Sequence, residues 1–231
     1  MTTITMSQLD TLLSISPVFT SLDQKQRAYL ANEATGREYG QGEWLAHYGD
    51  VWPCLFVVEK GEIAAIKESN EGRSLFVTRF GPGDIFWGLA FFIEDAPTLA
   101  GLMATEASRI HFWSRERLMS IFLENGGMSW ELMLLMVQRM LRASALVEGL
   151  AFQPVAGRLA GWLLEHYQDA VDERVARDMT LDEMAAQIGT TREMDCRLLY
   201  RFAEKGALQI SRTEFMISDS GTLEEYIVKE K

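Results

Sequence analysis

The chain has 231 residues, of which 48% are hydrophobic and 24% are charged, and this composition fits a globular protein of one large or two ordinary domains. No run of about 18 apolar residues occurs, so the sequence predicts no segment that spans a membrane. The first residues lack the basic start and the long apolar stretch of a signal peptide. We therefore expect a cytoplasmic protein.

The two cysteines, Cys54 and Cys196, lie far apart, form no CxxC motif and have no histidine partner nearby. This spacing argues against zinc, an iron–sulfur cluster and a disulfide scaffold, so no metal site is expected. The sequence also lacks the HExxH, P-loop and dinucleotide-binding glycine patterns, and any Ser/His/Asp order. An enzyme is therefore the least expected functional class.

The first half of the chain predicts two short helices followed by many strands. Helices are expected over Met6–Leu13 and Leu22–Glu33. From residue 37 to residue 113, short stretches of β-branched, aromatic and apolar residues alternate with glycine turns, which predicts a small barrel or roll. The expected strands are Trp44–His47, Leu55–Glu59, Glu62–Lys67, Ser74–Phe80, Ile85–Phe86, Leu99–Ala104 and Ser108–Trp113.

A long amphipathic helix is expected after the roll. Ser114–Leu123 has a helical pattern, Gly126 and Gly127 break it, and Ser129–Ala151 then repeats apolar residues near the helical period. Its length is about three heptads, so it predicts the seam of a coiled-coil dimer. The alternative is a helix packed on its own domain. The seam residues would be Met133, Met136, Val137, Met140 and Val147.

The stretch Met179–Ile217 predicts helix, tight turn, helix and hairpin, after a helix over Val155–Tyr167 that Pro154 starts. Gly189 supplies the break between the two helices. Either Thr190 or Thr191 can cap the second helix, with Glu193 as the capping-box partner of Thr190. The hairpin would pair Leu208–Ile210 with Phe215–Ile217, around a turn at Ser211–Thr213.

The second helix of this stretch has an apolar stripe and a charged face. Leu198, Leu199 and Phe202 form the stripe. Arginine can read guanine edges with two hydrogen bonds, and a carboxylate can accept from cytosine, so the charged face could enter a major groove. The alternative is an ordinary helical hairpin whose charged face is in contact with solvent alone. The candidate DNA-binding residues are Thr191, Arg192, Glu193, Arg197, Arg201 and, in the hairpin, Arg212, which we expect to touch phosphate.

The net charge of −11 argues against the binding of DNA. From Val155 to the end of the chain, 10 basic residues stand against 15 acidic ones, whereas Thr190–Lys205 has four basic and three acidic residues. Charges within about 8–10 Å of the phosphates decide binding more than the total does. We therefore expect weak non-specific binding and few phosphate contacts.

Four motifs occur in order along the chain. They are Leu55-Phe-Val-Val-Glu-Lys-Gly-Glu-Ile63, Gly81-Pro-Gly-Asp-Ile-Phe86, Leu150-Ala-Phe-Gln-Pro-Val-Ala-Gly-Arg-Leu159 and Gly189-Thr-Thr-Arg-Glu193 with Arg197. In this order, over about Phe19–Ile217, the chain resembles the family of the cyclic-AMP receptor protein and the fumarate–nitrate reduction regulator. The resemblance implies an α+β fold with an N-terminal cyclic-nucleotide-binding-like β-roll (a jelly roll), a long dimerisation helix and a C-terminal winged helix-turn-helix. The domains would cover residues 1–128, 129–152 and 153–231.

The resemblance also implies partners and roles. Family members are homodimeric transcription regulators that bind two-fold symmetric double-stranded DNA, so RNA polymerase and a small-molecule effector are expected partners. Arg192, Glu193 and Arg197 match the family's base-reading positions. Asp195 stands where the family usually has a small apolar residue packed inward, and Cys196 where glycine or serine is usual. An inward carboxylate must find a hydrogen-bond partner or cost stability, or it could orient an arginine.

The expected effector pocket departs from the cyclic-nucleotide pattern. By alignment, the ribose-binding glutamate is replaced by Gly88, the phosphate-binding arginine by Thr98, and the hydroxyl pair on the long helix by Ala143 and Ser144. A buried cyclic phosphate without its arginine loses a charge-assisted pair of hydrogen bonds. Binding of cyclic AMP or cyclic GMP is therefore not expected.

The remaining residues expected at this pocket are mostly apolar: Trp87, Leu89, Phe91, Phe92, Leu99 and Met140. Three interpretations stay open: a pocket for a hydrophobic or aromatic effector, a haem site, or an ordinary core that fills the vacated space. A haem would need an axial ligand, for which His47 and His111 are the histidines of the roll. A functional alternative is a small-molecule-binding protein whose DNA-binding domain has degenerated.

Overall fold

In a computed structural model of the chain, the structure describes residues 8–69, 74–167, 171, 173–177, 179–211 and 213–228. The chain forms two compact units. The first contains Met1–Lys67 and Val77–Leu141, and the second contains Glu68–Phe76 and Arg142–Lys231. No helix in the described part of the chain combines the length and the hydropathy that crossing a membrane requires.

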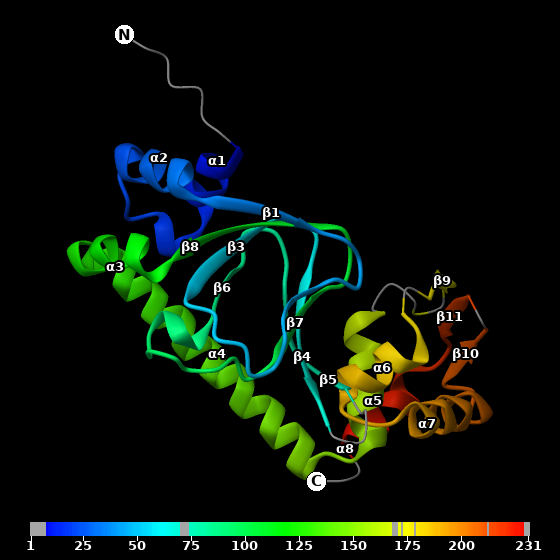
Figure 1. Cartoon of the computed structure of the whole chain (residues 1–231). Helices are drawn as coiled ribbons and strands as arrows, with labels where there is room; N and C mark the ends of the chain where they lie inside the picture. Colours follow the sequence, from blue (N-terminus) through cyan, green and yellow to red (C-terminus); the bar gives the residue numbers. More distant parts are fainter. Residues whose placement is uncertain are drawn as a thin grey trace. The chain divides into compact units, whose positions relative to one another are not determined.

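Three short helices open the first unit: α1 (Gln8–Ile15), the 3₁₀ helix η1 (Pro17–Phe19) and α2 (Gln24–Glu33). Figure 1 shows α1 and α2 together beside the start of the first strand. Asp23 caps α2, because its side chain accepts a hydrogen bond from the Gln26 amide and the Gln26 side chain accepts one from the Asp23 amide. The start of the predicted helix at Met6 lies outside the described residues.

The strands that follow form two four-stranded sheets, in the orders β1-β8-β3-β6 and β2-β7-β4-β5. The β-roll predicted from the sequence is therefore confirmed. Predicted and observed strands mostly agree to within one or two residues at each end, and β1 was not predicted as a strand. The observed strands are β1 (Thr35–Tyr39), β2 (Trp44–Ala46), β3 (Cys54–Lys60), β4 (Ile63–Glu68), β5 (Ser74–Phe80), β6 (Ile85–Trp87), β7 (Gly101–Ala104) and β8 (Ser108–Ser114).

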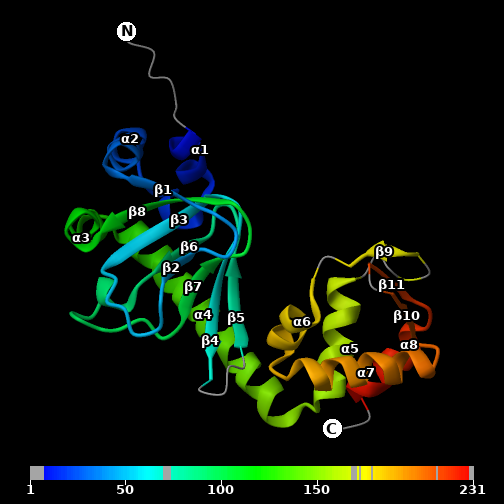
Figure 2. The same ribbon diagram turned by 45° about the vertical axis from the view of Figure 1, so that its right-hand side comes forward.

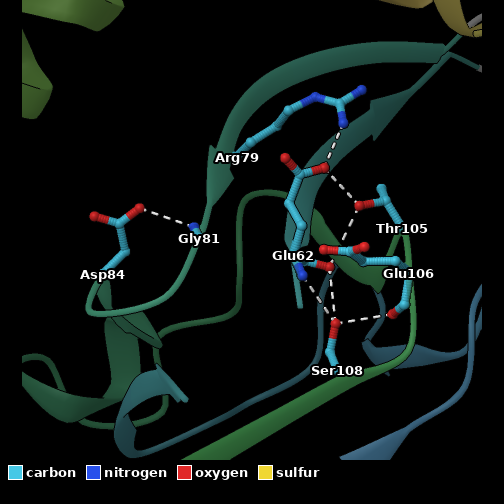
Figure 3. Close-up of polar contacts among 7 residues, drawn as sticks. All are labelled: Glu62, Arg79, Gly81, Asp84, Thr105, Glu106 and Ser108. Carbon is cyan, nitrogen blue, oxygen red and sulfur yellow. Dashed lines mark hydrogen bonds and ion pairs between the residues drawn. The ribbon is translucent and has the colours of Figure 1, made fainter. Parts of the chain in front are cut away.

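A tight turn at Gly61 joins β3 to β4. Gly61 has a φ of +81°, and a Cβ there would lie 2.3 Å from the Ser108 hydroxyl, so only glycine fits. The Ser108 hydroxyl accepts from the Glu62 amide at 3.0 Å, and the Glu62 carboxylate accepts from Thr105 and Arg79 (Figure 3). This network joins the start of β4 to β5, to the residue after β7 and to the start of β8.

The turn before β6 is held in a similar way. The Asp84 carboxylate accepts from the Gly81 amide at 2.9 Å (Figure 3), and the Gly83 amide donates to the Val58 carbonyl at 2.9 Å. Gly83 has a φ of +88°, which favours glycine. The turn therefore contacts β3 and places β6 beside it.

The helix α3 (Arg115–Glu124) leads into the long helix α4 (Gly126–Phe152), which runs from the first unit into the second. The prediction that Gly126 and Gly127 separate the helices was wrong in detail, since α4 includes both glycines. The Asn125 side chain accepts from the Met128 amide at 2.9 Å and so satisfies the first turn of α4. Asn125, rather than a glycine, therefore marks the boundary.

The second unit contains α5 (Val155–His166), β9 (Val175–Ala176), α6 (Leu181–Ile188), α7 (Arg192–Glu204), β10 (Leu208–Ile210), β11 (Glu214–Ile217) and α8 (Ser220–Val228). Figure 2 shows the helices gathered as a bundle with the three short strands at its edge. The strands pair in the order β10-β11-β9. The predicted winged helix-turn-helix is confirmed, whereas β9 and α8 were not predicted.

Candidate DNA interface and effector site

The turn between α6 and α7 is built from local capping. Thr180 caps α6 through a capping box with Glu183, and Gly189 ends that helix in the left-handed conformation, with a φ of 67° and a ψ of 48°. Thr191 caps α7, because its hydroxyl accepts from the Met194 amide at 3.3 Å. The sequence alone did not decide whether Thr190 or Thr191 caps this helix. The predicted capping box between Thr190 and Glu193 was wrong.

The faces of α7 agree with the predicted pattern. Leu198, Leu199 and Phe202 are buried in the core of the second unit. Of the candidates on this helix and at its cap, Thr191 is half-buried, and Arg192, Glu193, Arg197 and Arg201 are exposed.

Ion pairing holds the charged side chains of α7 only weakly. The Arg192 guanidinium lies 3.4 Å from the Asp182 carboxylate on α6, and both side chains are more than half exposed, so solvent screens this pair. Hydrogen bonds from the backbone and from the Thr191 hydroxyl lower the pKa of Glu193, so its carboxylate is ionised at neutral pH. Tyr200, which is 65% exposed, joins the same face and was missed, although it lies three residues after Arg197.

Asp195 is the exception on α7. Its side chain is fully buried, and neither carboxylate oxygen has a hydrogen-bond partner among the described residues. Burial raises the pKa of Asp195 to about 7, against the opposing positive charge of Arg177. Cys196, next to it, is half-buried.

The hairpin after α7 forms a three-stranded sheet at the edge of the unit. β10 pairs with β11 in the register Leu208↔Ile217, and β11 pairs with β9 in the register Phe215↔Val175. Arg212, predicted to touch phosphate from the tip of this hairpin, lies outside the described residues.

At the expected effector site, Gly88 is held by a backbone contact. Its amide donates to the Cys54 carbonyl at 3.0 Å, and a Cβ at this position would lie only 1.8 Å from the Trp52 carbonyl oxygen. Real Cβ atoms do not approach a carbonyl this closely. No side chain, including a glutamate, fits at position 88 unless the backbone moves.

Thr98 is likewise engaged in the local structure. Its side chain is 4% exposed, its hydroxyl donates to the His47 carbonyl at 2.8 Å, and its amide donates to the Asp50 carbonyl at 2.8 Å. Thr98 therefore joins two loops of the roll to each other, and its polar atoms are directed at backbone groups.

The aromatic residues of the predicted pocket belong largely to the core. Phe91 is fully buried, and its ring lies 5.0 Å from that of Phe92 and 6.0 Å from that of Phe122. Trp87 and Phe92 are half-buried and pack edge to face at 6.0 Å. Leu89 is half-buried, whereas Leu99 is 56% exposed. For Phe91, these contacts favour the interpretation as core.

A residue that the sequence did not single out joins α4 to this site. The Arg139 guanidinium lies 4.3 Å from the centre of the Trp87 ring and 5.0 Å from that of Phe80, and it donates a hydrogen bond to the Ile85 carbonyl. Arg139 therefore occupies the aromatic face that β5 and β6 present to the long helix. The only signal in the sequence is an arginine inside an apolar helical repeat.

His111 of the roll does not match a haem ligand. His111 is 8% exposed, its Nε2 contacts the Glu59 carboxylate, and a Cβ at Gly36 would lie 3.2 Å from its ring. The His47 ring lies 5.2 Å from the Trp44 ring, with the two planes tilted by 31°. Among the described residues, no group of three or more histidine, cysteine or acidic side chains is arranged to hold a metal ion. The residues present therefore do not fit a haem with axial His111.

The predicted seam residues form an apolar stripe on α4. Exposed fractions are 47% for Met133, 41% for Met136, 43% for Val137, 64% for Met140 and 65% for Val147. Ala143 and Ser144 are exposed on the part of α4 that belongs to the second unit, so their place at the effector site remains a prediction.

Comparisons with known proteins match both units. Residues 36–125 match the cyclic nucleotide-binding domain family, and residues 157–226 match the Crp-like helix-turn-helix domain family. A CRP-like cAMP-activated global transcriptional regulator of Mycobacterium tuberculosis is 25% identical over 220 residues, which cover 93% of this chain and 98% of the relative. The chain belongs to the CRP/FNR family of transcription regulators.

Other members support this assignment. The cyclic AMP receptor protein of Thermus thermophilus is 23% identical over 210 residues, covering 91% of this chain and 96% of the relative. The structure of the c-di-GMP responsive global regulator CLP of Xanthomonas campestris shares the fold, with a TM-score of 0.73 at 21% identity, over 85% of this chain and all of the other. These CRP/FNR relatives are transcription regulators rather than enzymes.

The contact at Gly88 leads to a first prediction. Gly88→Ala should lower the free energy of unfolding by about 1–3 kcal/mol, because the added methyl group must displace the Trp52 carbonyl. Denaturant unfolding of both proteins measures the change. Gly81→Ala is the matched control, since no atom lies within 4 Å of a Cβ placed there. Equal stability of the Gly88 and Gly81 variants would contradict the proposed contact.

Proposed function

We propose that this CRP/FNR-type regulator is a homodimer in the cytoplasm, reads a two-fold symmetric DNA site through α7, and responds to an effector that is not a cyclic nucleotide. The observation that carries the proposal is the Trp52 carbonyl at the Cβ position of Gly88. In the resemblance described above, this position supplies the glutamate that holds the ribose. RNA polymerase is the partner that the family implies.

Two further observations support an effector of different chemistry. Thr98 stands in place of the phosphate-binding arginine, and its hydroxyl is already used by the His47 carbonyl. The Arg139 guanidinium lies over Trp87 and Phe80 and donates to the Ile85 carbonyl. We expect a ligand that packs on aromatic rings.

The dimer proposal rests on the spacing of α4. Met133, Val137, Met140, Ser144, Val147 and Ala151 follow one another at alternate steps of four and three residues, which is the a/d pattern of a two-stranded coiled coil. Most of these apolar side chains are well exposed in the single chain. An apolar stripe of this length is rarely left in water, so a second copy of α4 is the proposed cover.

The DNA proposal rests on the geometry of α7. Its N-terminal end is capped by Thr191, its apolar stripe is fixed in the core, and Arg197 stands exposed one and a half turns into the helix. A recognition helix contacts base edges with residues of this part. The alternative, a degenerate DNA-binding domain, is favoured by the acidic balance of the second unit and by the unpartnered carboxylate of Asp195.

Removing Arg197 tests the DNA proposal. Arg197→Ala should cost about 1–3 kcal/mol per half-site at the best DNA sequence and relax selectivity at one base position, because a bidentate contact to guanine is lost. Selection from a random DNA library followed by titration measures both effects. Arg142→Ala, which removes an exposed arginine from α4, should leave selectivity unchanged. If no sequence is enriched under any effector condition, the degenerate-domain alternative is correct.

Changing the seam tests the dimer. Met140→Glu should convert the protein to monomers, because a carboxylate at a seam position is desolvated without a partner. Light scattering at micromolar concentration measures the mass. Gln138→Glu, an exposed position on the same helix outside the four-three repeat, should leave the dimer intact. A wild-type protein that is monomeric with and without DNA would refute the proposal.

Calorimetry tests the effector proposal. Cyclic AMP and cyclic GMP should give no binding heat at micromolar concentrations, because the site lacks both the glutamate and the arginine and position 88 admits no side chain. Small aromatic compounds screened by thermal shift provide the positive arm, and a hit should raise the unfolding temperature. Micromolar affinity for either cyclic nucleotide would overturn the assignment of Gly88 and Thr98.

A further inference from the structure

Asp195 is buried in the middle of the unit that binds DNA, where a charge is poorly tolerated. It lies in the first turns of α7, between the exposed candidates Glu193 and Arg197, yet its own side chain has no exposed surface. Both carboxylate oxygens lack a hydrogen-bond partner among the described residues. An ionised carboxylate in such a place costs far more free energy than a neutral one.

Arg177 and the charged groups of the elements that pack on α7 do little to offset this cost. Arg177, which follows β9 and is half-buried, is the cation whose field reaches the carboxylate, but no ion pair joins the two. On α5, the Arg158 guanidinium is directed at the carbonyls of Gln153 and Ile188, at 2.6 and 2.8 Å. His166, also on α5, stacks on Trp162 at 4.8 Å.

The acidic groups of the neighbouring helix are also engaged elsewhere. On α6, Asp182 faces Arg192, and the Glu183 carboxylate accepts from the amide and hydroxyl of Thr180. β10, which also packs on α7, has the sequence LQI and carries no charge. Asp195 therefore sits in an environment that favours its neutral form.

We propose that Asp195 makes the DNA-binding unit responsive to pH. In its protonated form the side chain lets α7 pack in the core of the unit, and loss of that proton weakens both the packing and the binding of DNA. The second part rests on the proposed reading of DNA by α7.

The direction follows from linkage. The pKa of Asp195 is raised to about 7 in the folded unit, above the ordinary value of 3.8 that applies to the unfolded chain. Between these values the folded unit holds a proton that the unfolded chain has released, so stability falls as pH rises, until it levels off above the folded pKa. DNA phosphates beside α7 add negative charge and favour the proton further, so DNA binding should also weaken as pH rises through neutrality.

The first experiment measures packing without DNA. Amide hydrogen exchange of α7 in the full chain, corrected for the intrinsic pH dependence of exchange, should show protection falling about tenfold between pH 6 and pH 8 in the wild type. Asp195→Asn and Asp195→Val, which cannot titrate, should show no such fall. Glu204→Gln removes an exposed carboxylate from the same helix and should keep the wild-type profile. All other side chains, His166 included, are common to the four proteins.

The second experiment measures DNA. At fixed salt, the affinity of the wild type for its selected sequence should fall about threefold to tenfold per protomer from pH 6 to pH 8, and less in the two Asp195 variants. Identical profiles for the wild type and both variants in the two experiments would overturn the proposal. If exchange depends on Asp195 but no DNA sequence is selected at any pH, proton-linked packing stands, and sequence recognition by α7 is what fails.

Discussion

The carbonyl of Trp52 lies where the first side-chain atom of residue 88 would be, and much of the site around it follows from this contact. A glycine at position 88 lets β6 end against the loop before β3, with the Gly88 amide bonded to the Cys54 carbonyl. Trp87 is thereby placed at the end of β6, where its ring packs on Phe92 and receives the Arg139 guanidinium. The fold of a cyclic nucleotide-binding domain is kept, while the space that a side chain of residue 88 would need is filled by backbone.

In the second unit, local capping and burial hold α7, the helix proposed to read DNA, on a protein with a net negative charge. Capping residues fix both ends of the α6–α7 turn, and three large apolar side chains anchor α7. Thr190–Lys205 has four basic residues against three acidic ones, while the acidic balance of the rest of the chain disfavours non-specific binding of DNA. Such a balance makes specific contacts count for a larger share of the total affinity.

The sequence predicted most of the fold because its signals were local. Gly189, the Thr191 cap and the stripe of Leu198, Leu199 and Phe202 act within a few residues of one another, and so do the glycine turns of the roll. β9 and α8 were missed, because a two-residue strand has no readable period and α8 follows the hairpin without a strong amphipathic pattern. The boundary at Asn125 was misplaced, since two glycines looked like a break but were tolerated inside a capped helix.

The site was harder to predict than the fold, because its decisive contacts join distant segments. The residues next to Gly88 in the sequence do not predict its contact with the Trp52 carbonyl. Those next to Arg139 do not predict its contacts with the rings of Phe80 and Trp87. For Asp195, the resemblance predicted an inward side chain, but only the packed unit could reveal that neither oxygen has a partner among the described residues.

The exposed methionines of the apolar stripe on α4 affect how readily the protein is oxidised. Met133, Met136 and Met140 expose between 41% and 64% of their side chains, so their thioether sulfurs are open to oxidants in the single chain. Oxidation to the sulfoxide turns a flexible apolar side chain into a polar one, and it does so along the surface proposed to pair with a second copy. Assembly would shield these sulfurs from peroxide, and a sulfoxide formed beforehand would oppose assembly until a reductase restored the thioether.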